Sequence, residues 1–112
     1  MKKVKIVHQK DVEPKKPFEG VFSKRVMTKI KDGSDRMSFN HVLIKSGWEH
    51  LLLNEDKDEI IYFLDGKAII SSDGKDTEVS AGNCVYIPAG VEYKYTASED
   101  ATMVCVYSPP AE

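Results

Sequence analysis

A lone glutamate heads one of the apolar runs of the sequence. Glu59 precedes IIYFL in the segment NEDKDEIIYFLDG. Side chains of a strand alternate between two faces, which places Glu59 on one face with Ile61 and Phe63. If that face is buried, the carboxyl group needs a hydrogen bond, a cation or a proton, because an unpaired buried charge is costly. Glu59 is therefore the first candidate for acid-base or metal-ligand chemistry.

Two tyrosines are the next candidates. Tyr93 and Tyr95 lie two residues apart and so share one face of a strand. A phenol can donate a hydrogen bond to a carboxylate, or ligate a Lewis-acidic metal once it is deprotonated. Around a carboxyl group, two phenols would form an amphipathic small-molecule pocket. The alternatives are that Tyr93 is an aromatic plug or pocket wall, and that both tyrosines are ordinary packing residues.

A second carboxylate and two histidines complete the candidates. Glu55 lies in the charged segment EDKDE, where it could face Glu59 or remain in a solvated loop. Two interior carboxylates repel each other unless a cation or a shared proton joins them, and such pairs separate their pKa values in a way that suits acid-base work. His41 and His50 offer imidazole ligands, which suit zinc, iron, nickel or copper, or they are hydrogen-bonded strand residues.

These side chains need strands to position them, and strand signals recur along the chain. Segments rich in β-forming residues alternate with polar or glycine-containing turns. They cover residues 21–30, 37–44, 59–64, 67–72, 77–80, 84–88, 91–97 and 101–107. The Asp-Gly pair at 65–66 predicts a tight hairpin, and SSDGKD repeats the same device one strand later. No segment has a convincing helical period, so the pattern predicts an all-β antiparallel sandwich or barrel.

The first 20 residues differ from the rest in being rich in lysine. They contain an apolar alternation and two prolines, at Val4, Ile6, Pro14 and Pro17. This predicts a short edge strand followed by an extended arm. Residues 21–108 would then form the barrel of a single domain that spans residues 1–112.

Two motifs resemble those of the cupin superfamily. Gly47, Glu59 and Gly66 have the spacing of its first motif, G-x5-H-x-H-x3-E-x6-G. The run GNCVYIPAGVEY, residues 82–93, resembles its second motif, G-x5-P-x-G-x2-H. The resemblance implies a jelly-roll β-barrel of two antiparallel sheets, in which the motif histidines and glutamate point inward and bind a divalent metal.

The departures from these motifs concern the metal ligands. The two HxH positions are Leu53 and Glu55, and Tyr93 stands at the last histidine position, so only Glu59 is kept. A looser spacing, with four residues before the glutamate, moves the HxH positions to residues 52 and 54 and restores no histidine. His50 would enter the barrel only in that shifted register.

Composition narrows the partners. The 112 residues carry a net charge of -2, with 30% charged residues of nearly balanced sign, so nothing indicates binding to nucleic acid or to an anionic membrane surface. No apolar run is long enough to cross a bilayer, and the N-terminus lacks the apolar stretch of a signal peptide, so we expect a soluble cytoplasmic protein. Cys84 and Cys105 each lie in an apolar stretch and are expected to be buried thiols.

The favoured function is a small-molecule-binding cupin whose metal site is lost or non-standard. Glu59 would act as the base and Tyr93 would stabilise an oxyanion in isomerase, epimerase, lyase or cyclase chemistry on a small carbonyl compound or sugar acid. The expected pocket residues are Tyr95, Glu55, Leu53 and His41. The resemblance also implies a homodimer that pairs through an edge strand and the N-terminal arm.

Two rival functions follow from the same residues. One is a metal-dependent oxygenase or lyase that holds iron, zinc, manganese, nickel or copper. Its ligands would come from Glu55, Glu59, His50 and Tyr93, with His41 as the alternative histidine. The other is a non-catalytic sensor or structural cupin whose barrel is closed by Leu53, Tyr93 and Tyr95, leaving no ligand-sized cavity.

Overall fold

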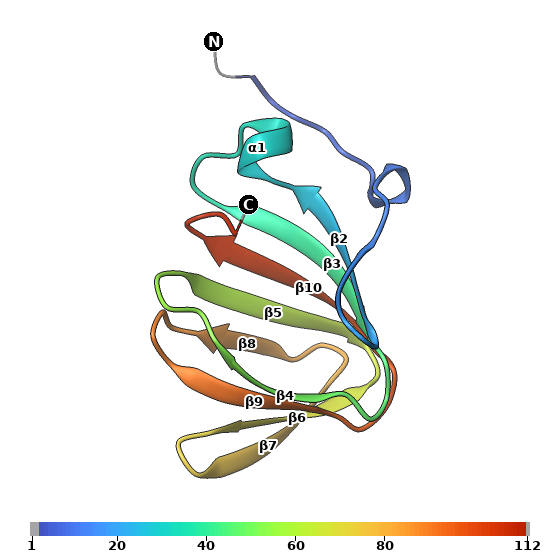
Figure 1. Cartoon of the computed structure of the whole chain (residues 1–112), viewed down its shortest axis with the longest axis vertical. Coiled ribbons are helices and arrows are strands. Elements are labelled where there is room, and N and C mark those ends of the chain that lie inside the picture. The colour runs from blue at the N-terminus through green and yellow to red at the C-terminus, as the bar shows by residue number, and fades with distance from the viewer. Residues whose placement is uncertain (1–2, 112) are drawn as a thin grey trace.

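Two antiparallel sheets form the body of the protein in the computed structural model, which describes residues 3–111 (Figure 1). The strands are β1 (Lys15–Phe18), β2 (Val21–Met27), β3 (Ser38–Ile44), β4 (Glu49–Leu53), β5 (Asp58–Asp65), β6 (Lys67–Ser72), β7 (Lys75–Ser80), β8 (Cys84–Ile87), β9 (Glu92–Ala97) and β10 (Ala101–Ser108). A 3-10 turn (Gln9–Asp11) and the short helix α1 (Lys29–Asp32) are the helical elements of this part of the chain. Both are far shorter than a membrane crossing requires, and residues 3–111 contain no helix with the length and apolarity to span a bilayer.

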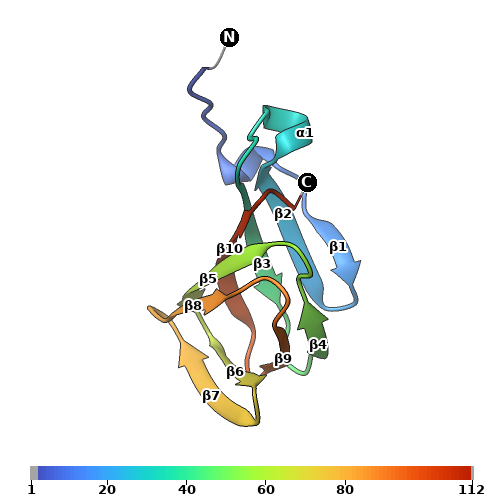
Figure 2. The ribbon, with the colours of Figure 1, turned by 90° about the vertical axis from the view of Figure 1, so that its left-hand side faces the viewer.

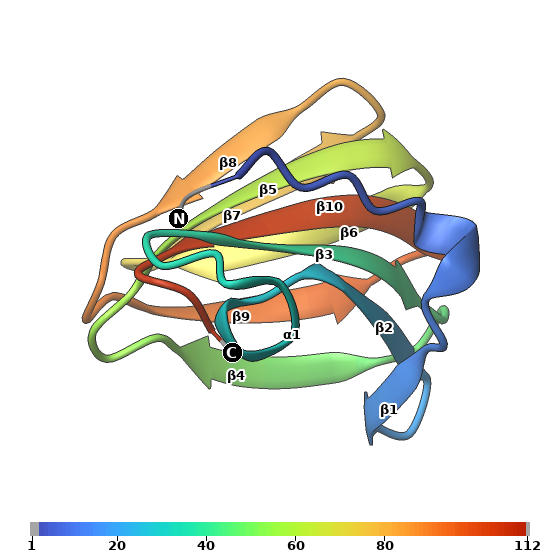
Figure 3. The same ribbon diagram turned by 90° about the horizontal axis from the view of Figure 1, so that it is seen from above.

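The strand order is that of a jelly roll. One sheet has the order β1-β2-β3-β10-β5-β8 and the other β4-β9-β6-β7. Seen from above, β10 runs between β3 and β5 although it comes last in the chain (Figure 3). Non-consecutive strands are thus neighbours in both sheets, which confirms the predicted all-β fold of two antiparallel sheets.

Alternating burial along the strands forms the core between the sheets. In β5 the buried side chains are Glu59, Ile61 and Phe63, and their neighbours in sequence are exposed. Tyr93 and Tyr95 are buried in β9 in the same alternating way. The predicted inward face of β5 is therefore confirmed, and Glu59 lies among apolar side chains.

The two Asp-Gly turns of the sequence behave differently. Asp73 and Gly74 both have positive φ values, 52° and 74°, and Ser72 pairs with Lys75, so this turn is a tight two-residue hairpin between β6 and β7. The predicted hairpin at residues 65–66 is wrong, because β5 and β6 belong to different sheets. Gly66 there packs so closely that an added Cβ atom would lie 2.2 Å from the carbonyl oxygen of Asp100.

Element boundaries correct several other expectations. The edge strand of the N-terminal segment is β1, which pairs with β2 (Figure 2), whereas Val4 and Ile6 are more than 90% exposed and belong to no strand. The segment 21–30 is not one strand, because Thr28 ends β2 and caps α1 by accepting a hydrogen bond from the amide of Lys31.

Strand β4 was not among the segments predicted from turn spacing. Cys105 is buried as expected but Cys84 is exposed.

Candidate functional site

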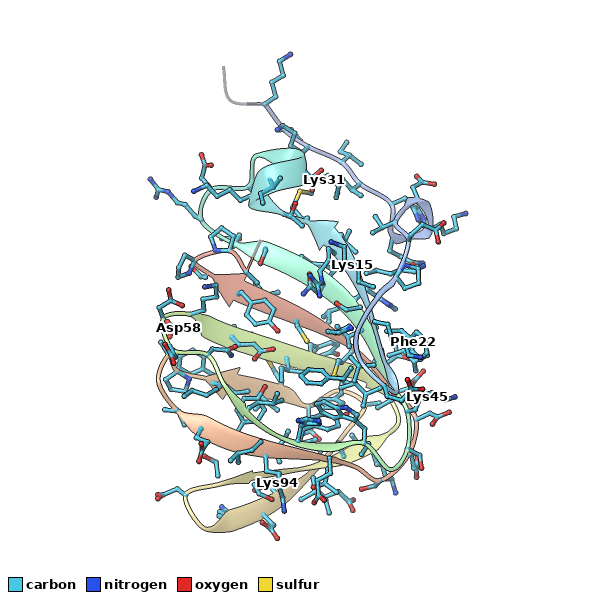
Figure 4. All side chains as sticks on the ribbon, viewed as in Figure 1. Lys15, Phe22, Lys31, Lys45, Asp58 and Lys94 are labelled. Carbon is cyan, nitrogen blue, oxygen red and sulfur yellow. The ribbon has the colours of Figure 1, made fainter. Side chains whose placement is uncertain are left out.

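A pocket of about 230 Å³ lies between the two sheets. Its wall is largely apolar, and the polar side chains that reach it include Ser23, Arg25, Asn40, Glu59, Tyr93 and Tyr107. Figure 4 shows side chains from both sheets filling the space around it. A wider groove of about 1040 Å³ runs outside the barrel between the N-terminal arm and the loop after α1, but the ionisable side chains that line it are not buried. The barrel pocket is therefore the candidate site.

Glu59 is the buried acid of this pocket, with only 3% of its surface exposed. The amide Nδ2 of Asn54 donates a hydrogen bond of 2.8 Å to Oε1 of Glu59, and the phenol of Tyr93 donates one of 3.2 Å to the same oxygen. The phenol of Tyr107 and the thiol of Cys105 are also hydrogen-bonded to the carboxyl group. Four donors from two strands, β9 and β10, and from the loop before β5 thus converge on one carboxyl group.

The electrostatics of the site follow from burial. Burial raises the pKa of Glu59 above its ordinary value of 4.5, and the four hydrogen bonds lower it without cancelling that effect. Burial and the negative charge of Glu59 together raise the pKa values of the Tyr93 and Tyr107 phenols, which stay protonated. The site therefore combines an acid that can take and release a proton with two neutral phenolic donors.

Strand register explains how these residues meet. Tyr107 of β10 is the register partner of Glu59 in the six-stranded sheet, and Tyr93 reaches Glu59 from the opposite sheet. Asn54 comes from the loop between β4 and β5, and its carbonyl oxygen accepts a hydrogen bond of 2.7 Å from the amide of Gly90. That bond connects the loop of the first motif to the turn of the second.

The register of β4 overturns part of the predicted site. Leu52 pairs with Tyr93 in the ladder between β4 and β9, so residue 52 faces the pocket and Leu53 faces outward, 48% exposed. Glu55 is exposed as well. Leu53 and Glu55 border a shallow groove on the surface instead of the barrel interior, and the looser motif spacing gives the observed register.

Neither histidine lies beside Glu59. The side chain of His41 is on the outer face of its sheet, because its neighbours Asn40 and Val42 are the inward residues of β3. His50 has the inward register but is exposed at the barrel edge, where its ring stacks on Trp48 at 4.8 Å. The structure therefore does not place His41 in the pocket.

The predicted metal-ligand set is not assembled either. Glu55, Glu59, His50 and Tyr93 do not gather around one point, and within residues 3–111 no group of three or more His, Cys, Asp or Glu side chains is arranged to hold a metal ion. Only Glu59 and Tyr93 of that set are in contact.

Several pocket residues were missed in the sequence. Tyr107 shares its strand face with Met103 and Cys105, so simple alternation along β10 would have found it. Arg25 shares a face with the buried Val21 and Ser23, which marks it as a cation directed at the interior. Asn54 was considered only as a possible HxH position of the first motif, where it lacks the histidine. Nothing else in the sequence indicates that its amide binds Glu59.

The comparison with protein families agrees with this architecture. A family model described as the cupin domain matches residues 40–107. The chain therefore belongs to the cupin family, which confirms the resemblance seen in its two motifs. With the pocket between its sheets, it is a small-molecule-binding cupin.

Two curated proteins illustrate the range of its relatives. An L-ectoine synthase of Halalkalibacterium halodurans is 30% identical over 112 residues, which cover 98% of this chain and 85% of that protein. An uncharacterized protein of Streptomyces coelicolor is 40% identical over 55 residues, which cover 48% of this chain. The match spans about half of the length of the Streptomyces protein, 52%.

Solved structures share the fold. The crystal structure of ectoine synthase from P. lautus superposes with a TM-score of 0.85 at 24% identity and covers 96% of this chain and 79% of that one. KdgF from Halomonas sp. superposes with a TM-score of 0.83 at 18% identity and covers 94% of both chains. The polyketide cyclase RemF from Streptomyces resistomycificus has a TM-score of 0.77 at 20% identity and covers 98% of this chain and 81% of that one.

Proposed function

We propose that the chain is an enzyme that transfers protons on a small carbonyl compound, with Glu59 as the acid-base group. The observation that carries the proposal is the position of Glu59: a carboxyl group, 3% exposed, that faces a pocket and accepts hydrogen bonds from Asn54 and Tyr93. A raised pKa suits a group that takes and returns a proton near neutral pH.

The phenols supply the second element of the chemistry. When Glu59 removes a proton next to a carbonyl group, negative charge develops on the carbonyl oxygen. Tyr93 and Tyr107 remain protonated because their pKa values are raised. Once Glu59 has taken the proton, either phenol can turn its single hydrogen from the carboxyl group to that oxygen. Return of the proton to a different carbon gives isomerisation, and its return to the opposite face of the same carbon gives epimerisation. Its delivery to a departing hydroxyl releases water and gives a lyase reaction. In a cyclase reaction an atom of the substrate also forms a ring bond to the carbonyl carbon, whose oxygen then leaves as water.

The size of the pocket and the relatives narrow the substrate. A pocket of about 230 Å³ is smaller than the roughly 300–1,000 Å³ of typical small-molecule sites and so suits a compact molecule. The relative named L-ectoine synthase matches nearly the whole chain, which supports a reaction on a small molecule and makes L-ectoine the first compound to test.

The divalent metal that the fold family implies does not fit the residues present. A divalent metal needs several ligand atoms around one point, whereas the amide of Asn54 and the phenol of Tyr93 point hydrogens at Oε1 of Glu59, and residues 3–111 contain no group of three or more His, Cys, Asp or Glu side chains arranged to hold a metal ion. The pocket also argues against a barrel closed by aromatic side chains, since Tyr93 and Tyr95 line an open space.

The test is proton exchange with solvent. L-ectoine and a panel of 2-oxo acids and sugar acids are incubated with the protein in D2O, and NMR follows deuterium incorporation and conversion. We expect Glu59→Gln to slow the reaction by about 10²- to 10⁴-fold. Glu55→Gln, a matched change at an exposed carboxylate, should leave the rate unchanged. An equal rate in Glu59→Gln and the wild-type protein would refute the proposal.

The homodimer expected from the sequence remains a prediction. The outer face of β5 exposes three large side chains, Ile60, Tyr62 and Leu64, by 42–44% each, and these are candidates for a contact between subunits. Sedimentation equilibrium measures the mass directly. A monomer at micromolar concentration would contradict the prediction.

A further inference from the structure

Two buried polar atoms of the pocket wall have no hydrogen-bond partner among residues 3–111: Nε1 of Trp48 and the phenolic oxygen of Tyr95. Tyr95 is only 1% exposed. Buried polar groups of folded proteins are nearly always paired, because an unpaired one has lost its contacts with water and gained none. Two such groups in one wall indicate a partner that enters the pocket.

The two rings that carry these polar atoms are in contact. The rings of Trp48 and Tyr95 meet edge to face, with centroids 5.7 Å apart. Trp48 also stacks on His50 at 4.8 Å and meets the ring of Phe18 at 5.4 Å. Because these contacts restrain the indole ring, its N–H group has a defined position in the pocket wall.

This pair is separate from the acid-base group. Tyr95 and Tyr93 share a face of β9 two residues apart, a distance of about 7 Å along a strand. Tyr93 contacts Glu59, so Tyr95 and Trp48 form a second polar region further along the barrel. At the level of Met103, one step along β10 from Cys105, the wall is apolar.

We propose that Trp48 and Tyr95 bind a neutral carbonyl oxygen of the substrate, at a subsite distinct from Glu59. An indole N–H group only donates, so it requires an acceptor. Burial raises the pKa of Tyr95, which keeps its phenol neutral and able to donate as well. Two neutral donors suit an amide, lactam or ketone better than a carboxylate, because a buried anion needs a cation or several strong donors, and the cation of the pocket, Arg25, hydrogen-bonds to Ser23 on β2.

The substrate class follows from this geometry. It is a compact molecule with a neutral carbonyl group apart from the atom that reacts at Glu59, because Tyr95 is one step along the inward face of β9 from Tyr93. The inference rests on the proposed function in that both place the substrate in the same pocket. Binding at the subsite does not itself require proton transfer by Glu59.

The single tryptophan of the chain makes the test direct, since a ¹⁵N-labelled sample gives one indole N–H signal, that of Trp48. The probe is 2-pyrrolidinone, a neutral lactam, titrated into the full chain. We expect the indole proton signal to move downfield and saturate. Tyr95→Phe, which removes one hydrogen bond, should weaken binding about 5-fold. Tyr86→Phe, a matched change at an exposed tyrosine of β8, should bind as the wild-type protein does.

Three results would overturn the subsite: an indole signal that does not move, equal binding by Tyr95→Phe and the wild-type protein, or saturation of the indole signal by acetate at a lower concentration than by 2-pyrrolidinone. Glu59→Gln separates the subsite from the proposed function. It should bind the lactam with wild-type affinity while its turnover is lost. Retained turnover in Glu59→Gln with intact lactam binding would refute the catalytic role and leave the subsite supported.

Discussion

Tyr93 of β9 donates its phenolic hydrogen to Oε1 of Glu59 on β5, and this bond of 3.2 Å joins the two sheets across the barrel interior. The same oxygen accepts from Asn54, whose loop is connected to the turn at Gly90. The carboxyl group is therefore fixed by both sheets and by both motif regions. Any change in its protonation acts on the contact between the sheets as well as on the chemistry of the pocket.

Removal of the Tyr93 donor should alter both rate and pH dependence. The hydrogen bond from Tyr93 lowers the pKa of Glu59, so Tyr93→Phe should raise that pKa further. If Glu59 acts as a base, the rise of activity with pH should move to higher pH in Tyr93→Phe. The maximal rate should fall about 10²-fold through loss of an oxyanion donor. The pH–rate profile and a ¹³C NMR titration of the Glu59 carboxyl measure these effects, and a titration at unchanged pH would count against them.

The raised pKa of Glu59 also predicts how stability depends on pH. The folded protein holds the Glu59 proton at pH values where the unfolded chain, with an ordinary pKa of 4.5, has released it. The stability from this proton is therefore fully present below pH 4.5 and is lost as pH rises through the raised pKa. Glu59→Gln does not titrate at this position. As pH rises through this range, the free energy of unfolding of the wild-type protein should thus fall relative to that of Glu59→Gln.

Urea unfolding of both proteins between about pH 4 and about pH 8 measures that difference. Asp32 and Asp100, whose pKa values are lowered by their hydrogen bonds, have the opposite dependence at lower pH. Both residues are present in the wild-type protein and in Glu59→Gln, so their contributions to the pH dependence of stability cancel in the comparison. A difference that is constant with pH would show that Glu59 titrates alike in the folded and unfolded states.

The sequence predicted the fold well because alternation and turn residues are local signals. The inward face of β5 follows from EIIYFL alone, and the hairpin at Asp73 follows from its two-residue turn. The same dipeptide at Asp65 connects strands of different sheets, and that depends on the close approach of Gly66 to Asp100, a contact between residues distant in sequence. Local sequence cannot distinguish these two turns.

The register of β4 was the main failure at the site. LLL is apolar in both registers, so alternation does not select which leucine faces inward. The loop before Glu59 interrupts the alternation, so the inward face of β5 does not fix that of the leucines. The choice is made by pairing with β9, where Leu52 is opposite Tyr93. Tyr93 was predicted as a donor to Glu59, and its hydrogen bond confirms this. Asn54 and Tyr107 were missed, because they come from a loop and from a strand distant in sequence.

This register predicts unequal effects of neighbouring leucines. Leu52→Ala removes a side chain that lines the pocket and packs against the core, and should cost about 2 kcal/mol of unfolding free energy. Leu53→Ala, at a residue 48% exposed, should change it by less than about 0.5 kcal/mol. Urea unfolding of the two variants compares them directly. The reverse order would restore the register in which Leu53 faces inward.

Gly47 and Gly66 both have positive φ values, but their replacement by alanine should destabilise the protein to different extents. Gly47 has φ 91° and no atom within 4 Å of an added Cβ atom, so Gly47→Ala carries only the backbone penalty of about 1–2 kcal/mol. Gly66 has φ 81°, and its added Cβ atom would lie 2.2 Å from the Asp100 carbonyl oxygen and 2.6 Å from Cα of Ala101. Because these are backbone atoms, neither can shift without displacing the neighbouring residues of the chain. Gly66→Ala should therefore cost about 2–5 kcal/mol, the sum of the backbone penalty and overpacking. Urea unfolding of both variants measures the two losses of unfolding free energy. Equal losses would show that Gly66 is required by turn conformation alone and not by packing between the sheets.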